Sequence, residues 1–437
     1  MQIIKYPERS TWASILARPV IDNSRLFATV QQVLDDVKAN GDSAVRKYTE
    51  MFDKVSVDTI EVTKKEINDA EQVIPVLLKQ AIEMARRNIW KFHVEQQHEY
   101  EEIQTSPGVY CWQKAIPIEK VGLYIPGGTA PLFSTVLMLA IPANIAECKE
   151  IVLCTPPDKS GNIHPAVLYA AKVAGVHRIF KVGGTQAIAA MAYGTETIPK
   201  VYKIFGPGNQ YVTAAKQLVS LKDVAIDMPA GPSEVEVLAD GTAHPAFVAA
   251  DMLSQAEHGI DSQSVLITVD EALIEKVQEQ IELQLEQLPR KDLAAKSLEN
   301  SKIILVKTLE EAVEMTNEYA PEHLIISTHY YMGVAENITN AGSVFLGHYT
   351  PESAGDYASG TNHTLPTNGY AKAYNGVNLD SFIRKVTFQH ITKDGLSNLS
   401  NAIILMAENE QLQAHSNAVK IRLDEDDEAD SEDNSRY

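Results

Sequence analysis

Cysteine is scarce in this sequence, with only three among 437 residues: Cys111, Cys148 and Cys154. None of them forms a CxxC pair, so the sequence predicts neither a disulfide framework nor a zinc site built from thiolates. Cys154 follows the apolar residues 151–153, as in a buried strand. This setting favours an inert core thiol over a nucleophile of the aldehyde dehydrogenase kind.

Basic residues are also in short supply: 38 lysines and arginines face 58 aspartates and glutamates, which gives a formal charge of −20. No basic cluster offsets this excess locally, whereas nucleic-acid backbones and anionic membranes need such a cluster. We therefore expect neither nucleic acid nor a membrane as partner. Residues 424–437 hold eight acidic residues against one arginine, and we expect this end to be solvated and disordered.

Long apolar runs are absent too. Lys5, Glu8 and Arg9 stand where a signal peptide would need an apolar stretch. No segment reaches membrane-spanning length without interruption. The resulting expectation is a cytoplasmic protein.

What the sequence does have is an alternation of short apolar strands and helices, joined by glycine turns, over residues 121–218 and again over 234–346. This rhythm is typical of parallel sheets covered by helices on both faces. Before it, apolar spacing predicts helices over 24–39 and over 64–97, the second broken at Pro75. After it, we expect tail helices over 380–390 and 396–415.

The predicted fold class is therefore α/β, with two Rossmann-like lobes whose similarity suggests a duplicated design, an N-terminal arm and a helical C-terminal tail. A chain of 437 residues exceeds a single typical core, which agrees with several lobes. We divide it into an arm (1–21), a first lobe (22–125 with 233–378), a second lobe (126–232), a tail (379–423) and the acidic end (424–437).

The dinucleotide fingerprint GxGxxG is missing, but three glycine turns follow predicted strands, at residues 126–128, 183–184 and 206–208. Taken by itself, each could equally be an ordinary turn. Together, at the carboxyl ends of strands in one sheet, they could present backbone N–H groups and helix N-termini to a pyrophosphate. They indicate a nucleotide cleft only weakly.

Three segments carry residues suited to chemistry. Gln255 and His258 stand three apart at a predicted helix end, where they could grip zinc, although a histidine at a helix C-terminus needs no such role. Glu322 and His323 are adjacent and suit two separate proton tasks, or else a cap and a partly buried histidine. The small, polar residues 351–363 include Asp356 and His363 as metal or substrate candidates, with a surface loop as the alternative. On composition alone, His415 would not be counted among the candidate functional residues.

The same segments resemble the histidinol dehydrogenase family. The motifs VGLYIPGG, APLFSTVLMLA, GGTQAIAA, KIFGPGN, DMPAGPSE, LSQAEHG, APEHL and PESAGDYASGTNHTLPT occur in this order. The resemblance covers about residues 10–423, and the acidic run that follows has no counterpart in the family pattern.

The resemblance implies one zinc ion per subunit and a dinucleotide, NAD, bound without the common fingerprint. The zinc ligands would be Gln255, His258, Asp356 and His415. The proton-transfer residues would be Glu322 and His323. The substrate pocket would comprise Ser233, Gln255, His258, His323, Asp356, His363, Glu410 and His415, and the NAD contacts would be Tyr124, Gln186 and Asn209.

By the same resemblance the reaction is the oxidation of histidinol through its aldehyde to histidine, with two NAD. His323 would remove the hydroxyl proton and Glu322 would activate water for the aldehyde step. The family's homodimers have interleaved tails, so the site should be shared between subunits. The rival interpretations are a zinc hydrolase, which would give no NADH, and a binding protein for imidazole compounds, which would give no turnover.

Overall fold

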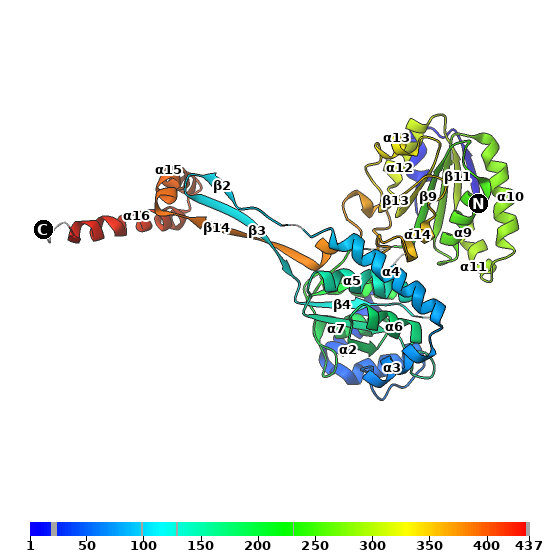
Figure 1. Ribbon diagram of the computed structural model, residues 1–437, viewed down its shortest axis with the longest axis horizontal. Coiled ribbons are helices and arrows are strands. Elements are labelled where there is room, and N and C mark those ends of the chain that lie inside the picture. The colour runs from blue at the N-terminus through cyan, green and yellow to red at the C-terminus, as the bar shows by residue number, and fades with distance from the viewer. Residues whose placement is uncertain (19–23, 98, 128–129, 230, 434–437) are drawn as a thin grey trace. The chain divides into compact units, whose positions relative to one another are not determined.

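A computed structural model describes residues 1–18, 24–97, 99–127, 130–229 and 231–433 (Figure 1). The chain forms two compact units, one made of Met1–Gln96 with Ile118–Phe382 and the other of Gln97–Pro117 with Ile383–Tyr437. Among the described residues, no helix combines the length and apolar character needed to cross a bilayer.

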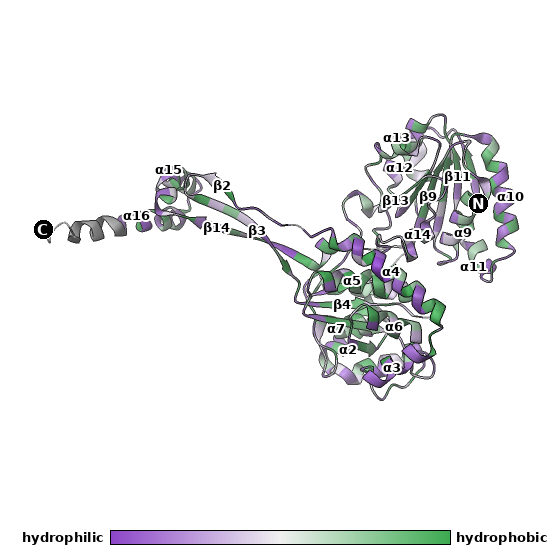
Figure 2. Cartoon of the chain, viewed as in Figure 1, coloured by the Kyte–Doolittle hydropathy of each residue, from purple (hydrophilic) through white to green (hydrophobic). Residues whose placement is uncertain are grey.

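The first unit contains a five-stranded parallel sheet in the order β6-β5-β4-β7-β8. Its strands are β4 (Lys120–Tyr124), β5 (Glu150–Thr155), β6 (Arg178–Lys181), β7 (Lys203–Phe205) and β8 (Ala225–Ile226). Nearly every residue of β4, β5 and β6 is buried, as expected for strands covered on both faces. Helix α5 (Phe133–Ile145), apolar all round and largely green in Figure 2, is correspondingly buried.

The other helices of this lobe are α2 (Ser24–Tyr48), α3 (Lys64–Val73), α4 (Val76–Val94), α6 (Pro165–Val173), α7 (Gly184–Tyr193) and α8 (Gln210–Ser220). The predicted break at Pro75 is confirmed, since α3 ends and α4 begins around it. The predicted lobe boundary differs. The sequence predicts a lobe made of 22–125 with 233–378, whereas in the structure α2, α3 and α4 pack on α7, α6 and α5, and β4 is the central strand of this sheet. The reason is the buried stripe of α2, where Val30, Leu34 and Val37 join the core of this sheet.

A six-stranded parallel sheet forms the other lobe of the first unit, in the order β1-β11-β10-β9-β12-β13. Its strands are β1 (Gln2–Lys5), β9 (Glu234–Ala239), β10 (Gln263–Thr268), β11 (Lys302–Leu305), β12 (His323–Ser327) and β13 (Ser343–Leu346). Without β1, the strands run third, second, first, fourth and fifth in chain order, as they do in the five-stranded sheet. The shared order agrees with a duplicated design.

Helices cover both faces of this second sheet. One face packs on α9 (Pro245–Ala256), α10 (Glu271–Leu285) and α11 (Lys291–Glu299). The other packs on α12 (Leu309–Tyr319), α13 (Tyr331–Ala335) and the N-terminal residues, which include the short helix α1 (Trp12–Ile15). The predicted arm is therefore an integral part of this lobe: β1 pairs with β11, and Trp12 and Leu16 are buried.

The second unit is an antiparallel sheet, β14-β3-β2, followed by two helices. Its elements are β2 (Ile103–Ser106), β3 (Val109–Pro117), β14 (Ile383–Ile391), α15 (Lys393–Asn409) and α16 (Gln413–Asp433). The predicted helical tail is confirmed by α15 and α16. The helix expected over 380–390 is wrong, because β14 pairs along its whole length with β3, a partner far away in the sequence. Residues 424–433, expected to be disordered, continue α16, and 434–437 lie outside the described residues.

Candidate active site

The strand order of the five-stranded sheet reverses between β4 and β7. Open parallel sheets bind ligands at the carboxyl ends of strands at this point. Tyr124 ends β4, and the turn at 206–208 follows β7. Gly206 has φ of +123°, and a Cβ there would lie 2.0 Å from the Tyr124 carbonyl oxygen, so only glycine fits.

The three predicted NAD contacts stand at the carboxyl end of β4 or in the segments that follow β6 and β7. The Gly184 N–H donates to the Tyr124 hydroxyl (3.1 Å), and Asn209 Oδ1 caps α8 by accepting from two backbone N–H groups. Gln186 is fully buried, and its Nε2 donates to Asp53 Oδ2 (3.2 Å), a carboxyl whose pKa burial raises to about 6. Among the described residues Gln186 Oε1 has no hydrogen-bond partner. A buried acceptor without a donor fits a polar ligand that supplies one.

Another group of candidate residues lies at the amino ends of β9 and β12. These two strands are neighbours, and the strand order of the six-stranded sheet reverses between them. Glu322 precedes β12 and His323 begins it. The backbone of Glu234, the first residue of β9, holds both: its N–H donates to Glu322 Oε2 (2.9 Å), and its carbonyl oxygen lies 3.1 Å from His323 Nδ1. Both side chains are almost completely buried.

Three carboxylates surround the His323 imidazole. Nδ1 lies 3.7 Å from Glu322 Oε2 and 3.7 Å from Glu352 Oε1, and Nε2 lies 3.6 Å from Asp356 Oδ1. Burial opposes a charged imidazolium, but the carboxylates outweigh it and raise the pKa of His323 above its usual value. Burial also raises the pKa of Glu322 and of Glu352 to about 8.

Potential metal ligands lie beside this pair. Ligand atoms of His258, Glu352 and Asp356 are all within 4.8 Å of one another. Both polar atoms of the Gln255 side chain are buried and have no hydrogen-bond partner among the described residues. An unpaired buried amide oxygen fits a residue that binds a cation. Helix α9 ends at Ala256, before His258, which was predicted to lie on it; the turn is held by the His258 N–H donating to the Gln255 carbonyl (3.2 Å).

Glu352 was not singled out from the sequence. It stands four residues before Asp356 on α14 (Glu352–Tyr357), and this spacing places two carboxylates on one helical face. This four-residue spacing of two carboxylates was visible in the polar segment 351–363, but that segment was expected to be a loop rather than a helix.

The remaining predicted residues divide between the two units. His363 lies in the first unit, where Nε2 is 3.1 Å from Thr135 Oγ1 and Nδ1 is 3.0 Å from the Asp356 carbonyl oxygen. Ser233 directly precedes β9, and its carbonyl accepts from Gln263 N–H. Glu410 and His415 belong to the second unit, where both side chains are exposed.

The fold and the site define a two-lobed α/β protein, with glycine turns at the carboxyl ends of one parallel sheet and a buried glutamate–histidine pair beside possible metal ligands at the amino ends of the other. The family model for histidinol dehydrogenase matches residues 16–423. The chain belongs to the histidinol dehydrogenase family, which confirms the resemblance of its motifs.

Individual relatives agree. The chain is 66% identical over 425 residues to a histidinol dehydrogenase of Bacteroides fragilis, covering 97% of this chain and 99% of that one. It is 51% identical over 412 residues to the Escherichia coli K12 histidinol dehydrogenase, covering 94% of each. A crystal structure of histidinol dehydrogenase from Elizabethkingia anophelis, 55% identical, superposes with a TM-score of 0.95 over 97% of this chain and 98% of that one.

Proposed function

We propose that this chain oxidises histidinol through its aldehyde to histidine, the final steps of histidine biosynthesis, with two NAD as hydride acceptors. Family membership supports the substrate. The observation that carries the mechanism is the buried His323 Nε2, which has no hydrogen-bond partner among the described residues.

The backbone fixes the tautomer of His323. A carbonyl oxygen can only accept, so Nδ1 must carry the proton that it shares with the Glu234 carbonyl, 3.1 Å away. The surrounding carboxylates raise the pKa of His323 and favour the charged ring, so Nε2 holds a lone pair only in the neutral form, which zinc held at Asp356 would favour by offsetting their charge. Among the described residues Nε2 has no hydrogen-bond partner, and Asp356 Oδ1 lies 3.6 Å from it. We assign Nε2 as the base that removes the substrate's hydroxyl proton.

Glu322 is assigned to the second step. One carboxylate oxygen accepts the Glu234 N–H, which orients the group, and the other is the oxygen that we assign to water. Through this second oxygen, Glu322 would take a proton from the water molecule that attacks the aldehyde carbon. A buried carboxyl with a pKa of about 8 is a stronger base than an exposed one.

Gln255, His258 and Asp356, with His415, are the proposed zinc ligands. When bound, zinc would offer a Lewis-acidic template for the imidazole and amino nitrogens of the substrate and would offset the negative charge beside His323. Ser233, His363 and Glu410 are assigned to substrate contacts. In the other lobe Tyr124, Gln186 and Asn209 are assigned to NAD, which supplies the nicotinamide that receives hydride.

We also propose a homodimer in which His415 and Glu410 complete the partner's site. Two observations support it. Both side chains are exposed within their own unit, and so are several apolar side chains of its two helices and of the turn between them. The exposed apolar residues are Leu405, Met406, Leu412 and Ile421. Apolar surface of this kind is commonly covered by another subunit.

The direct test of the activity is to mix the protein with histidinol, NAD and zinc and to follow NADH absorbance. We expect steady NADH formation that a strong chelator abolishes and added zinc restores. A zinc hydrolase would give no NADH under these conditions, and a binding protein would bind histidinol in a titration without turnover. Either result would contradict the proposal.

A further inference from the structure

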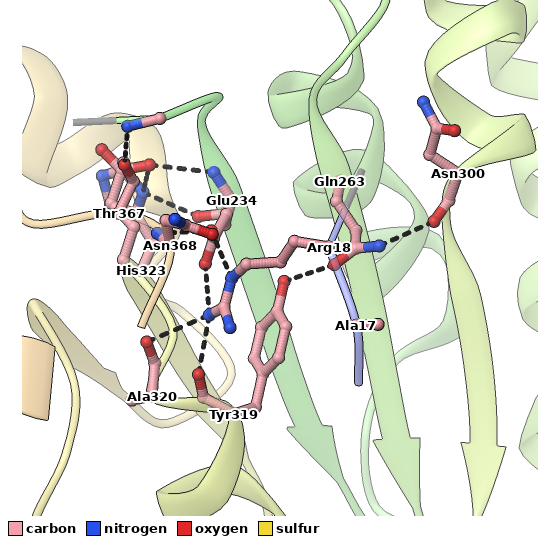
Figure 3. A network of polar contacts seen from close by, with 12 residues as sticks. Ala17, Arg18, Glu234, Gln263, Asn300, Tyr319, Ala320, His323, Thr367 and Asn368 are labelled. Carbon is pink, nitrogen blue, oxygen red and sulfur yellow. Dashed lines mark hydrogen bonds and ion pairs between the residues drawn. The ribbon is translucent and has the colours of Figure 1, made fainter. Parts of the chain in front are cut away.

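A buried ion pair lies directly behind the Glu322 and His323 pair. Arg18, just beyond α1, directs its guanidinium to the carboxylate of Glu234 (Figure 3). Arg18 Nε donates to Oε1 (2.6 Å) and Nη2 donates to Oε2 (2.7 Å), so the contact is bidentate. The Glu234 side chain is only 2% exposed and that of Arg18 is 15% exposed.

The same guanidinium also holds the chain that leads into Glu322. Nη2 donates to the carbonyl oxygens of Tyr319 (2.7 Å) and Ala320 (3.3 Å), and the guanidinium carbon lies 4.0 Å from the centre of the Tyr319 ring. Ala320 is in the left-handed conformation, with φ of +53°, which a residue with a side chain adopts only at a cost. The arginine therefore stabilises a strained turn two residues before Glu322.

Arg18 thus acts on the acid–base pair from two sides. Through the Glu234 carboxylate it fixes the start of β9, whose N–H and carbonyl hold Glu322 and His323. Through the two carbonyls it fixes the turn from which Glu322 and His323 project. The Glu234 carboxylate is further fixed by the N–H of Asn368, which donates to Oε1 (2.7 Å).

We propose that Arg18 is a positioning residue for the reaction: its planar fork sets the register between the Glu234 backbone and the Glu322 and His323 side chains. This inference rests on the proposed function for its kinetic consequence, but the positioning itself is a property of the protein without substrate. Arg18 touches neither pair member directly, so it is not a catalytic residue.

The main test is Arg18→Lys. Lysine keeps the positive charge against the buried Glu234 carboxylate, but a single ammonium cannot reproduce the bidentate fork and the two carbonyl contacts. Arg9→Lys is the matched control, because Arg9 lies in the same N-terminal segment and makes one exposed ion pair with Glu314 (2.6 Å). Exposed ion pairs of this kind contribute little to the stability of the protein.

For Arg18→Lys we expect kcat to fall about 10- to 100-fold, the scale of a small misplacement of catalytic groups, while KM for histidinol changes by less than about threefold. Zinc content should stay at the wild-type value, and Arg9→Lys should match the wild type. An unchanged kcat in Arg18→Lys, or a rise in KM alone, would overturn the proposal. The proposal would also be overturned if the loss of activity in Arg18→Lys were no greater than the fraction of that variant that is unfolded.

Two further measurements separate positioning from simple stability. In Arg18→Ala, which leaves Glu234 without its cation, millimolar guanidinium should restore part of kcat, whereas urea, which has a similar shape and no charge, should not. If this variant does not fold, Arg18→Lys still decides the question. Equal effects of guanidinium and urea would contradict the assignment.

The second measurement needs no substrate. The ¹⁵N signal of His323 Nδ1 should report the hydrogen bond to the Glu234 carbonyl in the wild type, and that bond should weaken in Arg18→Lys but not in Arg9→Lys. An unchanged signal refutes the positioning role. If the wild type fails to oxidise histidinol, the proposed function fails, and this signal still tests Arg18 independently.

Discussion

Replacing Glu322 with glutamine separates its proposed chemical role from its structural one. Oε2 of Glu322 accepts one hydrogen bond, from the Glu234 N–H at 2.9 Å, and the amide oxygen of glutamine can accept the same bond. The geometry of the pair is therefore retained, and only the basic carboxylate is lost. Glu322→Gln should slow the aldehyde step by about 100- to 10,000-fold, the usual contribution of a general base.

This factor corresponds to about 2.7–5.4 kcal/mol in the activation free energy. The alcohol step should change far less, because the base that we propose for it is His323 Nε2, and the glutamine leaves that imidazole in place. The assay is stopped-flow NADH formation, started either from histidinol or from the aldehyde. His323→Ala is the contrasting variant and should impair both steps. If Glu322→Gln slowed both half-reactions equally, the division of labour would be refuted.

Three other predictions follow from the site and its surroundings. His258→Ala should lower zinc content, measured by elemental analysis, far more than His363→Ala does, and equal content in both would exclude His258 as a ligand. Glu236 is fully buried, and burial raises its pKa to about 8 from 4.5, so its contribution to stability is complete below pH 4.5 and is lost as pH rises to 8. Glu236→Gln should flatten the fall of the melting temperature over this window, which reflects about 1.4 kcal/mol per pH unit, and an unchanged slope would contradict this. Mixed dimers of His415→Ala and His323→Ala, refolded together and confirmed by mass, should regain about half of the wild-type activity if tails cross between subunits. Recovery no greater than the average of the two variants would exclude a shared site.

Much of the fold was predictable because its signals are local. The strand, turn and helix rhythm over 121–346 places nearly every element of the two parallel sheets, since apolar periodicity and glycine turns act within a few residues. The failures involve distant partners. Strand β14 is defined by pairing with β3, and α2 joins the five-stranded sheet through packing that local periodicity does not reveal.

The site shows the same division. Glu322 and His323 stand out as neighbours in the sequence, and Gln255 with His258 by their spacing. Arg18 does not, because its role depends on contact with Glu234, which lies 216 residues further along the chain. The free Nε2 of His323 is likewise visible only once β9 and β12 are paired.

The central claim is a four-electron oxidation in one site, and the ratio of products tests it most directly. With limiting histidinol and excess NAD, NADH should be counted by absorbance and histidine by chromatography after the reaction is complete. The account predicts two NADH and one histidine for each histidinol consumed. One NADH per histidinol, with free aldehyde as the end product, would contradict it.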